Sequence, residues 1–217
     1  MITWIASFDI GKKNFAFCIE EFDTDLFLNI ENILPNQRYK EDGTPTEKMN
    51  EILNKVYNNG KIILHCNRDL TNNCDIKKKL DPETFHNMID VLDEYLPYWE
   101  KCKAFVIEEQ MSFGRKINTM AIKLGQHCYS YFLHHFGRFK TVVEFSAYHK
   151  TQVLGAEKIK KNNKWKSIDK PKRKKKNINK AISILENRGE SEILKNLTTA
   201  KKKDDLAKII PSIYRAF

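Results

Sequence analysis

The first 22 residues contain two apolar, strand-like segments separated by a four-residue polar turn. Residues 2–10 are rich in bulky apolar side chains that alternate with smaller or polar ones. Residues 11–14, GKKN, are typical of a turn, and residues 15–22, FAFCIEEF, provide the returning strand. The chain is therefore expected to begin with a β-hairpin, which requires a sheet with at least one antiparallel pair of strands.

Behind this hairpin, strand-like and helix-like segments alternate. Further strands are expected at 61–66, 104–109 and 139–145, and helices at 49–56, 81–96, 115–136, 177–188 and from about 199 onward. Asp81 and Pro82 form a typical helix start, Gly189 a typical helix end, and Pro211 interrupts the last helix. This order predicts one α/β domain over residues 1–217, with a mixed five-stranded sheet flanked by helices and an insertion at about 25–60.

Composition excludes several classes of protein. Hydrophobic residues make up 41% of the chain and aromatic residues 11%, which argues against global disorder. No apolar stretch approaches the roughly 18 residues of a membrane-spanning helix, and the N-terminal residues lack a basic leader typical of secretion. The five cysteines are scattered without a CxxC pair, and His65, Cys66 and Cys74 are unusually spaced for zinc. Reduced thiols inside a cell are expected.

The positive charge is concentrated in one segment. The net charge is +10, and residues 157–180 hold 12 Lys and Arg against Glu157 and Asp169, so the rest of the chain is neutral. A basic block on a neutral body indicates a polyanionic partner, most often nucleic acid. A solvated loop or a targeting signal is the alternative interpretation.

Three acidic sites lie on apolar segments far apart in the sequence. Asp9 lies within the first strand, which is expected to be central, Glu108 and Glu109 end the strand at 104–109, and Asp204 and Asp205 lie near the start of the last helix. Carboxylates on buried elements need a cation or hydrogen bonds. If they converge, their hard oxygen ligands suit Mg²⁺ or Mn²⁺, and two such ions would serve phosphodiester hydrolysis. Each site alone has another explanation. Asp9 could face a turn, Glu109 could be an exposed residue at a strand end, and Asp204 and Asp205 could stabilise the helix dipole.

Four segments together resemble one enzyme family. FDIGKKN at 8–14 resembles the first strand and turn of RuvC-class Holliday junction resolvases, closest to the poxvirus-type branch of large cytoplasmic DNA viruses. VIEEQ at 106–110 resembles the second acidic strand of that family, and KKDDLA at 202–207 its last acidic helix. KRKKK at 172–176 lies where the family has a basic patch before a helix. The motifs occur in the family order and leave residues 25–60 uncovered.

The resemblance implies a fold, a reaction and a set of site residues. It implies an RNase H-like fold, a homodimer, two Mg²⁺ per protomer and paired nicks across a four-way DNA junction. Asp9 would bridge both metals, Glu108 rather than Glu109 would bind one, and Asp205 would bind the other. The cytoplasm of an infected cell is the expected location if the protein is viral.

Basic residues receive their roles from the same resemblance. Either Lys175 or Lys176 would approach the scissile phosphate or stabilise the attacking water. The expected DNA-binding residues lie in the first turn and in the basic run: Lys12, Lys13, Lys172, Arg173, Lys174, Lys175 and Lys176.

The last acidic motif departs from the family pattern. In the family, the second and fifth residues of Asp-Asp-x-Ala-Asp lie three apart and face the metals. Here the fifth position is Lys208, whose ammonium would repel divalent cations. Three explanations stay open: a weakened or inactive enzyme, an altered or truncated C-terminus, or Asp204 as substitute ligand. Substitution needs a rearrangement, since Asp204 lies about 100° around the helix from Asp205.

Other functions are weighed against this one. A structure-specific DNA-binding protein on a nuclease scaffold is the non-enzymatic alternative, and Lys208 supports it. An actin-like ATPase also has an Asp-x-Gly turn, but the chain has only eight glycines and no second glycine-rich phosphate loop. A P-loop motif is absent. Trp165 in the basic block could stack on a nucleotide or simply be exposed.

Overall fold

The computed structural model describes residues 1–25, 33–72, 81–110, 117–146, 157–161 and 163–199. Its elements, in chain order, are β1 (Ile2–Asp9), β2 (Phe15–Asp23), the short 3₁₀ helix η1 (Pro35–Gln37), α2 (Glu47–Asn58), β3 (Lys61–Arg68), α3 (Pro82–Glu94), α4 (Leu96–Trp99), β4 (Cys102–Glu109), α5 (Thr119–Phe136), β5 (Thr141–Ser146), β6 (Lys158–Lys161), β7 (Lys164–Ser167), α7 (Lys170–Arg188) and α8 (Ser191–Thr199).

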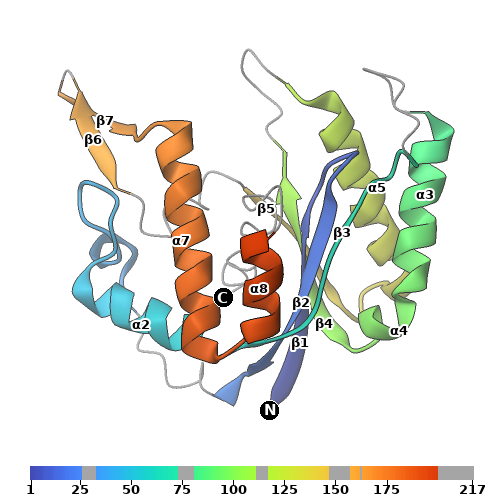
Figure 1. The fold of residues 1–217 in the computed structure, drawn as a ribbon, viewed down its shortest axis with the longest axis horizontal. Coiled ribbons are helices and arrows are strands. Elements are labelled where there is room, and N and C mark those ends of the chain that lie inside the picture. The colour runs from blue at the N-terminus through green and yellow to red at the C-terminus, as the bar shows by residue number, and fades with distance from the viewer. Residues whose placement is uncertain (26–32, 73–80, 111–116, 147–156, 162, 200–217) are drawn as a thin grey trace.

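Five strands form the main sheet in the order β3-β2-β1-β4-β5 (Figure 1). β1, β2 and β3 pair antiparallel, whereas β1, β4 and β5 pair parallel. The predicted N-terminal hairpin and mixed five-stranded sheet are confirmed. Because β1 is the central strand, its carboxyl end lies next to that of the parallel strand β4.

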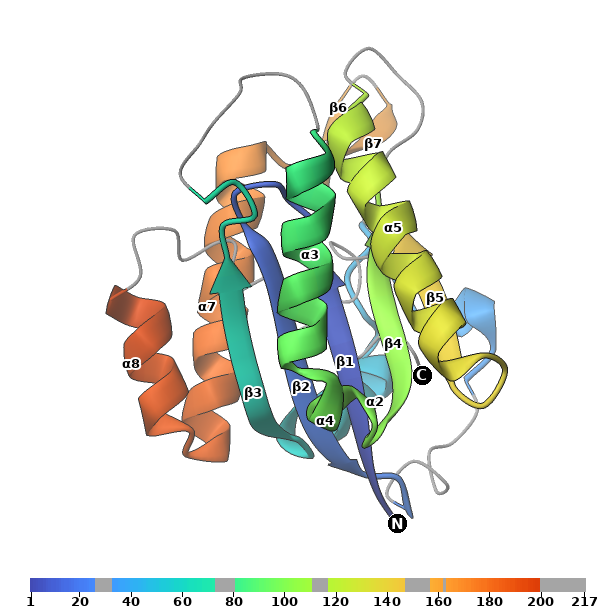
Figure 2. The ribbon, with the colours of Figure 1, turned by 90° about the vertical axis from the view of Figure 1, so that its right-hand side faces the viewer.

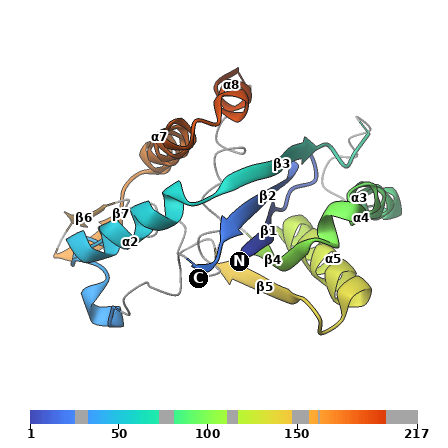
Figure 3. The same cartoon turned by 90° about the horizontal axis from the view of Figure 1, so that it is seen from below.

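Helices cover both faces of this sheet, as Figures 2 and 3 show. On the face of α3, α4 and α5, Phe8 and Phe105 pack with Trp99 and Phe132 in a core rich in aromatic rings. On the face of α2, α7 and α8, the sheet packs against aliphatic side chains, Ile184 of α7 among them. Alternation along each strand divides the side chains between these two cores. The prediction of a sheet flanked by helices is confirmed.

Local signals fixed several helix ends. The Asp81 side chain accepts a 2.8 Å hydrogen bond from the Thr84 backbone N–H and caps α3. Gly189 has φ of 69° and ends α7, donating its N–H to the carbonyls of Glu186 and Leu185. α5 begins at Thr119 with Asn118 as its cap, later than the predicted residue 115.

The described residues of the basic block form β6, β7 and the first half of α7, most of which the sequence did not predict. The expected helix start near Asn177 is wrong, because α7 already begins at Lys170 with Pro171 in its first turn. Hydrophobic periodicity begins only at Ile178, so the lysine-rich first turns gave no helical pattern despite their good helix propensity. The β6–β7 hairpin and α8 were also missed, and the last helix expected beyond Thr199 lies outside the described residues.

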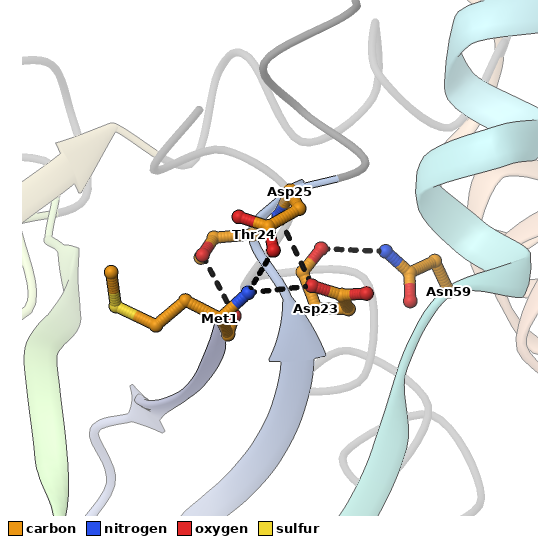
Figure 4. Close-up of polar contacts among 5 residues, drawn as sticks. All are labelled: Met1, Asp23, Thr24, Asp25 and Asn59. Atoms are coloured by element: carbon orange, nitrogen blue, oxygen red, sulfur yellow. Dashed lines mark hydrogen bonds and ion pairs between the residues drawn. The ribbon is translucent and has the colours of Figure 1, made fainter.

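Polar contacts close the open end of the β1–β2 hairpin (Figure 4). The Met1 ammonium contacts the Asp23 carboxylate at 3.0 Å and the Asp25 carboxylate at 2.5 Å. These two carboxylates raise the pKa of the Met1 amino group. The Asn59 side chain donates a 3.0 Å hydrogen bond to the Asp23 carbonyl, so the end of α2 is joined to the same corner. This end of the sheet lies opposite the carboxyl end of β1.

Candidate active site

Asp9 is the last residue of the central strand β1. It alternates with Ile5 and Ser7, and Ile5 belongs to the core beneath α7. Asp9 therefore points to the face covered by α7 rather than the face covered by α5. The sequence indicated a carboxylate within a buried strand at 2–10, and the structure ends that strand one residue earlier, at Asp9.

Glu108 lies next to Asp9 across the two parallel strands. β1 and β4 pair as far as Phe8 and Ile107, and Asp9 and Glu108 are the residues that follow. Glu108 also alternates with Val106, which lies in the core beneath α7. The two carboxylates consequently share one face and one edge of the sheet.

Glu109, the neighbour of Glu108, belongs to the opposite face. Its side chain is exposed, and its backbone pairs with Ser146 on β5. Gln110 lies just beyond the strand and donates a 3.4 Å hydrogen bond from its side chain to the Glu108 carbonyl. The alternation of side chains along β4 thus places Glu108 and Glu109 on opposite faces of the sheet. The sequence alone favoured Glu108 only through its resemblance to the family motif.

The basic end of α7 lies at the same end of the sheet. In Figure 1 the first turns of α7 are at the end where β1 and β4 terminate, while Arg188 lies at the far end. Lys174 precedes Ile178 by one turn and Leu185 by three, and both of those residues pack in the core. Lys174 therefore continues the inward stripe of α7 toward the carboxylates.

The two lysines named by sequence reasoning lie elsewhere on the helix. Lys175 is exposed, and Lys176 forms a 2.9 Å ion pair with Glu157, which precedes β6. Lys172 is exposed as well, one turn before Lys175. Sequence reasoning missed the inward position of Lys174 because spacing gives the phase of a helix only when its boundaries are known.

The turn after Asp9 is tight. A Cβ on Gly11 would lie 3.0 Å from the carbonyl oxygen of Asn14, so glycine permits this close approach. The Lys12 carbonyl accepts a 2.9 Å hydrogen bond from Leu70. The pKa of Asp81 is lowered, chiefly because its carboxylate accepts hydrogen bonds from Thr84. The positive charge of Lys12 contributes to the same shift. Lys12 is thus close to the start of α3, and Lys13 is exposed.

The structure brings together part of the predicted metal site. Asp9 and Glu108 share an edge, whereas Asp204, Asp205 and Lys208 lie outside the described residues. No cluster of three His, Cys, Asp or Glu side chains suited to a metal occurs within the described ranges. Asp9 and Glu108 are two hard oxygen donors of the kind that Mg²⁺ prefers, and a further carboxylate would be needed to complete a ligand set.

A second polar group on the same sheet face escaped sequence reasoning. Arg188, at the end of α7, lies with its Nη1 3.2 Å from the Glu20 carboxylate and 3.6 Å from the Glu190 carboxylate. Its Nε donates a 2.7 Å hydrogen bond to the Tyr57 carbonyl. Burial raises the pKa of Glu20 to about 7, although Arg188 opposes that shift. The feature of the sequence that could have indicated this buried group is Glu20, a glutamate within a largely apolar strand.

Two viral proteins resemble the whole chain. Protein 170L of Invertebrate iridescent virus 6, called uncharacterized, is 32% identical over 230 residues, which cover 95% of this chain and 85% of the relative. The chain belongs to the 170L family. Protein 97L of Invertebrate iridescent virus 3, likewise called uncharacterized, is 30% identical over 215 residues. The matched region covers 95% of this chain and 95% of the relative. No protein-family model matches.

Solved structures identify the fold of this 170L family member. The Fowlpox virus resolvase in complex with Holliday junction DNA is 18% identical, with a TM-score of 0.53 and coverage of 100% of this chain and 96% of the other. Thermus thermophilus RuvC is 11% identical, also with a TM-score of 0.53, at 99% and 95% coverage. The predicted RNase H-like fold is confirmed. No helix in the described ranges is long and apolar enough to cross a membrane.

Proposed function

We propose that this protein is a Holliday junction resolvase, an endonuclease that makes paired nicks in four-way DNA junctions. The observation that carries the proposal is the placement of Asp9 and Glu108 on one face at the ends of adjacent parallel strands. The lysine-rich start of α7 lies at this same end. The fold is shared with a viral resolvase solved with junction DNA, which supports DNA as the substrate.

The chain's own residues would divide the chemistry as follows. Asp9 and Glu108 would hold divalent cations, with Asp205 or Asp204 completing the ligand set from the last acidic motif. When bound, two Mg²⁺ or Mn²⁺ ions supply activation of the attacking water and stabilisation of the leaving oxygen. Lys174, on the inward stripe of α7, would approach the scissile phosphate and balance its charge. Lys175, being exposed, is better placed to contact phosphate away from the cut.

Substrate recognition would rest on phosphates and on junction shape. The surplus of positive charge lies within 157–180, and phosphate contacts carry orientation rather than sequence information. A homodimer would place two active sites about a two-fold axis, which suits paired cuts in a nearly symmetric junction. For a viral protein of this kind, the expected place of action is the cytoplasm of an infected cell.

A catalytically weakened or inactive junction-binding protein is the second candidate. Lys208 favours it, because a lysine occupies the position where the resembled motif has an acidic ligand. Both candidates bind branched DNA with a strong dependence on salt, so binding alone does not separate them.

Cleavage of a labelled four-way junction tests the proposal. Wild type and Lys208→Asp are each incubated with Mg²⁺ or Mn²⁺, beside a linear duplex of the same sequence as substrate control. Paired symmetric nicks by wild type support an active resolvase with Lys208 tolerated. Cutting by Lys208→Asp alone supports the site but makes the natural chain a disabled enzyme. If both proteins bind the junction and neither cuts it, the chain is a junction-binding protein and not a resolvase.

A further inference from the structure

The β6–β7 hairpin is a strongly basic element outside the main sheet. Its strands pair from Lys158 with Ser167 to Lys161 with Lys164, and they form a two-stranded sheet of their own. Figure 1 shows it next to the start of α7 and apart from the five-stranded sheet. The sequence from 158 to 168 holds five lysines and no acidic residue. Such an element attracts a polyanion.

Contacts at its base hold this hairpin in place. The Lys158 N–H donates a 2.6 Å hydrogen bond to the Asp42 carbonyl. A Cβ on Gly43, whose φ is 81°, would lie 3.2 Å from the Lys158 side chain, so the neighbouring turn packs closely on it. Ile168, which follows β7, is buried. An isolated two-stranded hairpin is marginally stable in water, so these contacts give the element a defined orientation.

The ring of Trp165, on β7, is exposed among the lysines of the hairpin. Trp165 is 40% exposed, and it pairs across the strands with Lys160 on the same face of the hairpin. The Lys160 ammonium lies 5.7 Å from the centre of the Trp165 ring. By contrast, Trp99 is fully buried with its indole N–H bonded to the Leu92 carbonyl. A large exposed ring beside cations is the combination that binds bases and phosphates together.

We infer that the β6–β7 hairpin receives an unstacked nucleobase of a DNA strand on Trp165, while its lysines contact the adjacent phosphates. The inference rests on the proposed function in taking DNA as the partner, and it adds a base-stacking contact outside the cleavage site. A base in a continuous duplex has both faces covered, so the contact requires a branch point, a strand end or a single strand. Stacking contributes about 1–3 kcal/mol per base and tolerates any sequence.

Binding without cleavage tests this contact separately from catalysis. With divalent metal chelated, tryptophan fluorescence and affinity are measured against a four-way junction, a single strand and a continuous duplex. Wild type is expected to show quenching with the junction or the single strand and less with the duplex. Trp165→Ala should abolish this quenching and weaken affinity about 5- to 150-fold, while Trp165→Phe keeps most of the affinity without the signal.

Charge variants complete the experiment. Lys160→Gln should weaken binding, whereas Lys195→Gln, an exposed change on α8, should not. Junction cutting by a Trp165→Ala protein that binds as tightly as wild type overturns the hairpin contact and leaves the resolvase standing. Quenching of Trp165 by single strands in a protein that cuts nothing supports the contact and removes the resolvase. Quenching by anionic lipid vesicles but by no DNA overturns both.

Discussion

The Arg188 guanidinium lies 3.2 Å from the Glu20 carboxylate, and their side chains are 2% and 0% exposed. This pair fastens the end of α7 to β2, in the interior of the domain. The basic end of the same helix lies at the end of the sheet where β1 and β4 terminate (Figure 1). Arg188 and the lysine-rich start of α7 thus lie at opposite ends of one helix.

Glu20 makes the stability of the fold sensitive to pH. Burial raises its pKa from 4.5 to about 7. A raised carboxyl pKa adds stability that is fully present below pH 4.5 and is lost as the pH rises through 7. In urea unfolding at pH 5 and pH 8, Glu20→Gln should remove this loss, which amounts to about 1.4 kcal/mol per pKa unit. Glu192→Gln, an exposed change on α8, should keep it; equal pH dependence in Glu20→Gln and wild type would contradict the prediction.

Gly60 makes room for the Arg188 guanidinium. A Cβ at residue 60 would overlap Arg188 Nη2 and lie 3.0 Å from the Phe22 ring. Gly60→Ala should therefore lower the free energy of unfolding by about 1–3 kcal/mol. Gly125→Ala, within helix α5, is the matched control, because its Cβ would make an ordinary van der Waals contact with Ile10, at 4.0 Å. Thermal unfolding of both variants checks this; similar melting temperatures would show that Arg188 moves aside without cost.

The alternation of apolar residues predicted the strands of the main sheet. The run of charged residues at the start of α7 gave no such pattern, so this part of the helix was not predicted. β1, β2 and β4 are buried strands whose bulky residues gave clear signals, and Asp9 and Glu108 stood out against them. The first turns of α7 contain no apolar residue that marks a face, so its start was placed seven residues late. That shift also hid the phase that turns Lys174 inward. The hairpin around Trp165 was missed because its strands are mostly lysine.

Strand alternation gives a matched pair of variants for catalysis. Glu108 shares a face with Asp9, whereas Glu109 lies on the opposite face and is exposed. If the two-carboxylate site cuts DNA, Asp9→Asn and Glu108→Gln should reduce junction cleavage at least about 100-fold while junction binding persists. Glu109→Gln should cut at a rate near that of wild type. Full cleavage by Glu108→Gln, or loss of cleavage by Glu109→Gln, would assign the wrong glutamate to the site.

The inward stripe of α7 predicts different roles for two adjacent lysines. Lys174 continues the face of Ile178 toward the carboxylates, and Lys175 is exposed. Under single-turnover conditions with saturating enzyme, Lys174→Gln should slow junction cleavage at least about 10-fold with little change in affinity. Lys175→Gln should instead weaken binding and leave the cleavage rate of bound junction unchanged. The reverse pattern would restore Lys175 as the lysine at the scissile phosphate.

Salt dependence distinguishes lysines that bind phosphate from lysines that pack within the protein. Lys172 and Lys175 are exposed one turn apart on α7, whereas Lys180 lies 4.6 Å from the Tyr57 ring centre, with its pKa lowered by burial. In junction binding measured from low to moderate salt with metal chelated, the double variant Lys172→Gln and Lys175→Gln should lower the log–log slope by about 2, since each lysine neutralises one phosphate. Lys180→Gln removes the same kind of charge from the same helix, yet it should leave the slope unchanged because its ammonium faces α2. If all three lysines affected the slope equally, the positive segment would act as a diffuse charge, and the placement of α7 over the DNA path would be wrong.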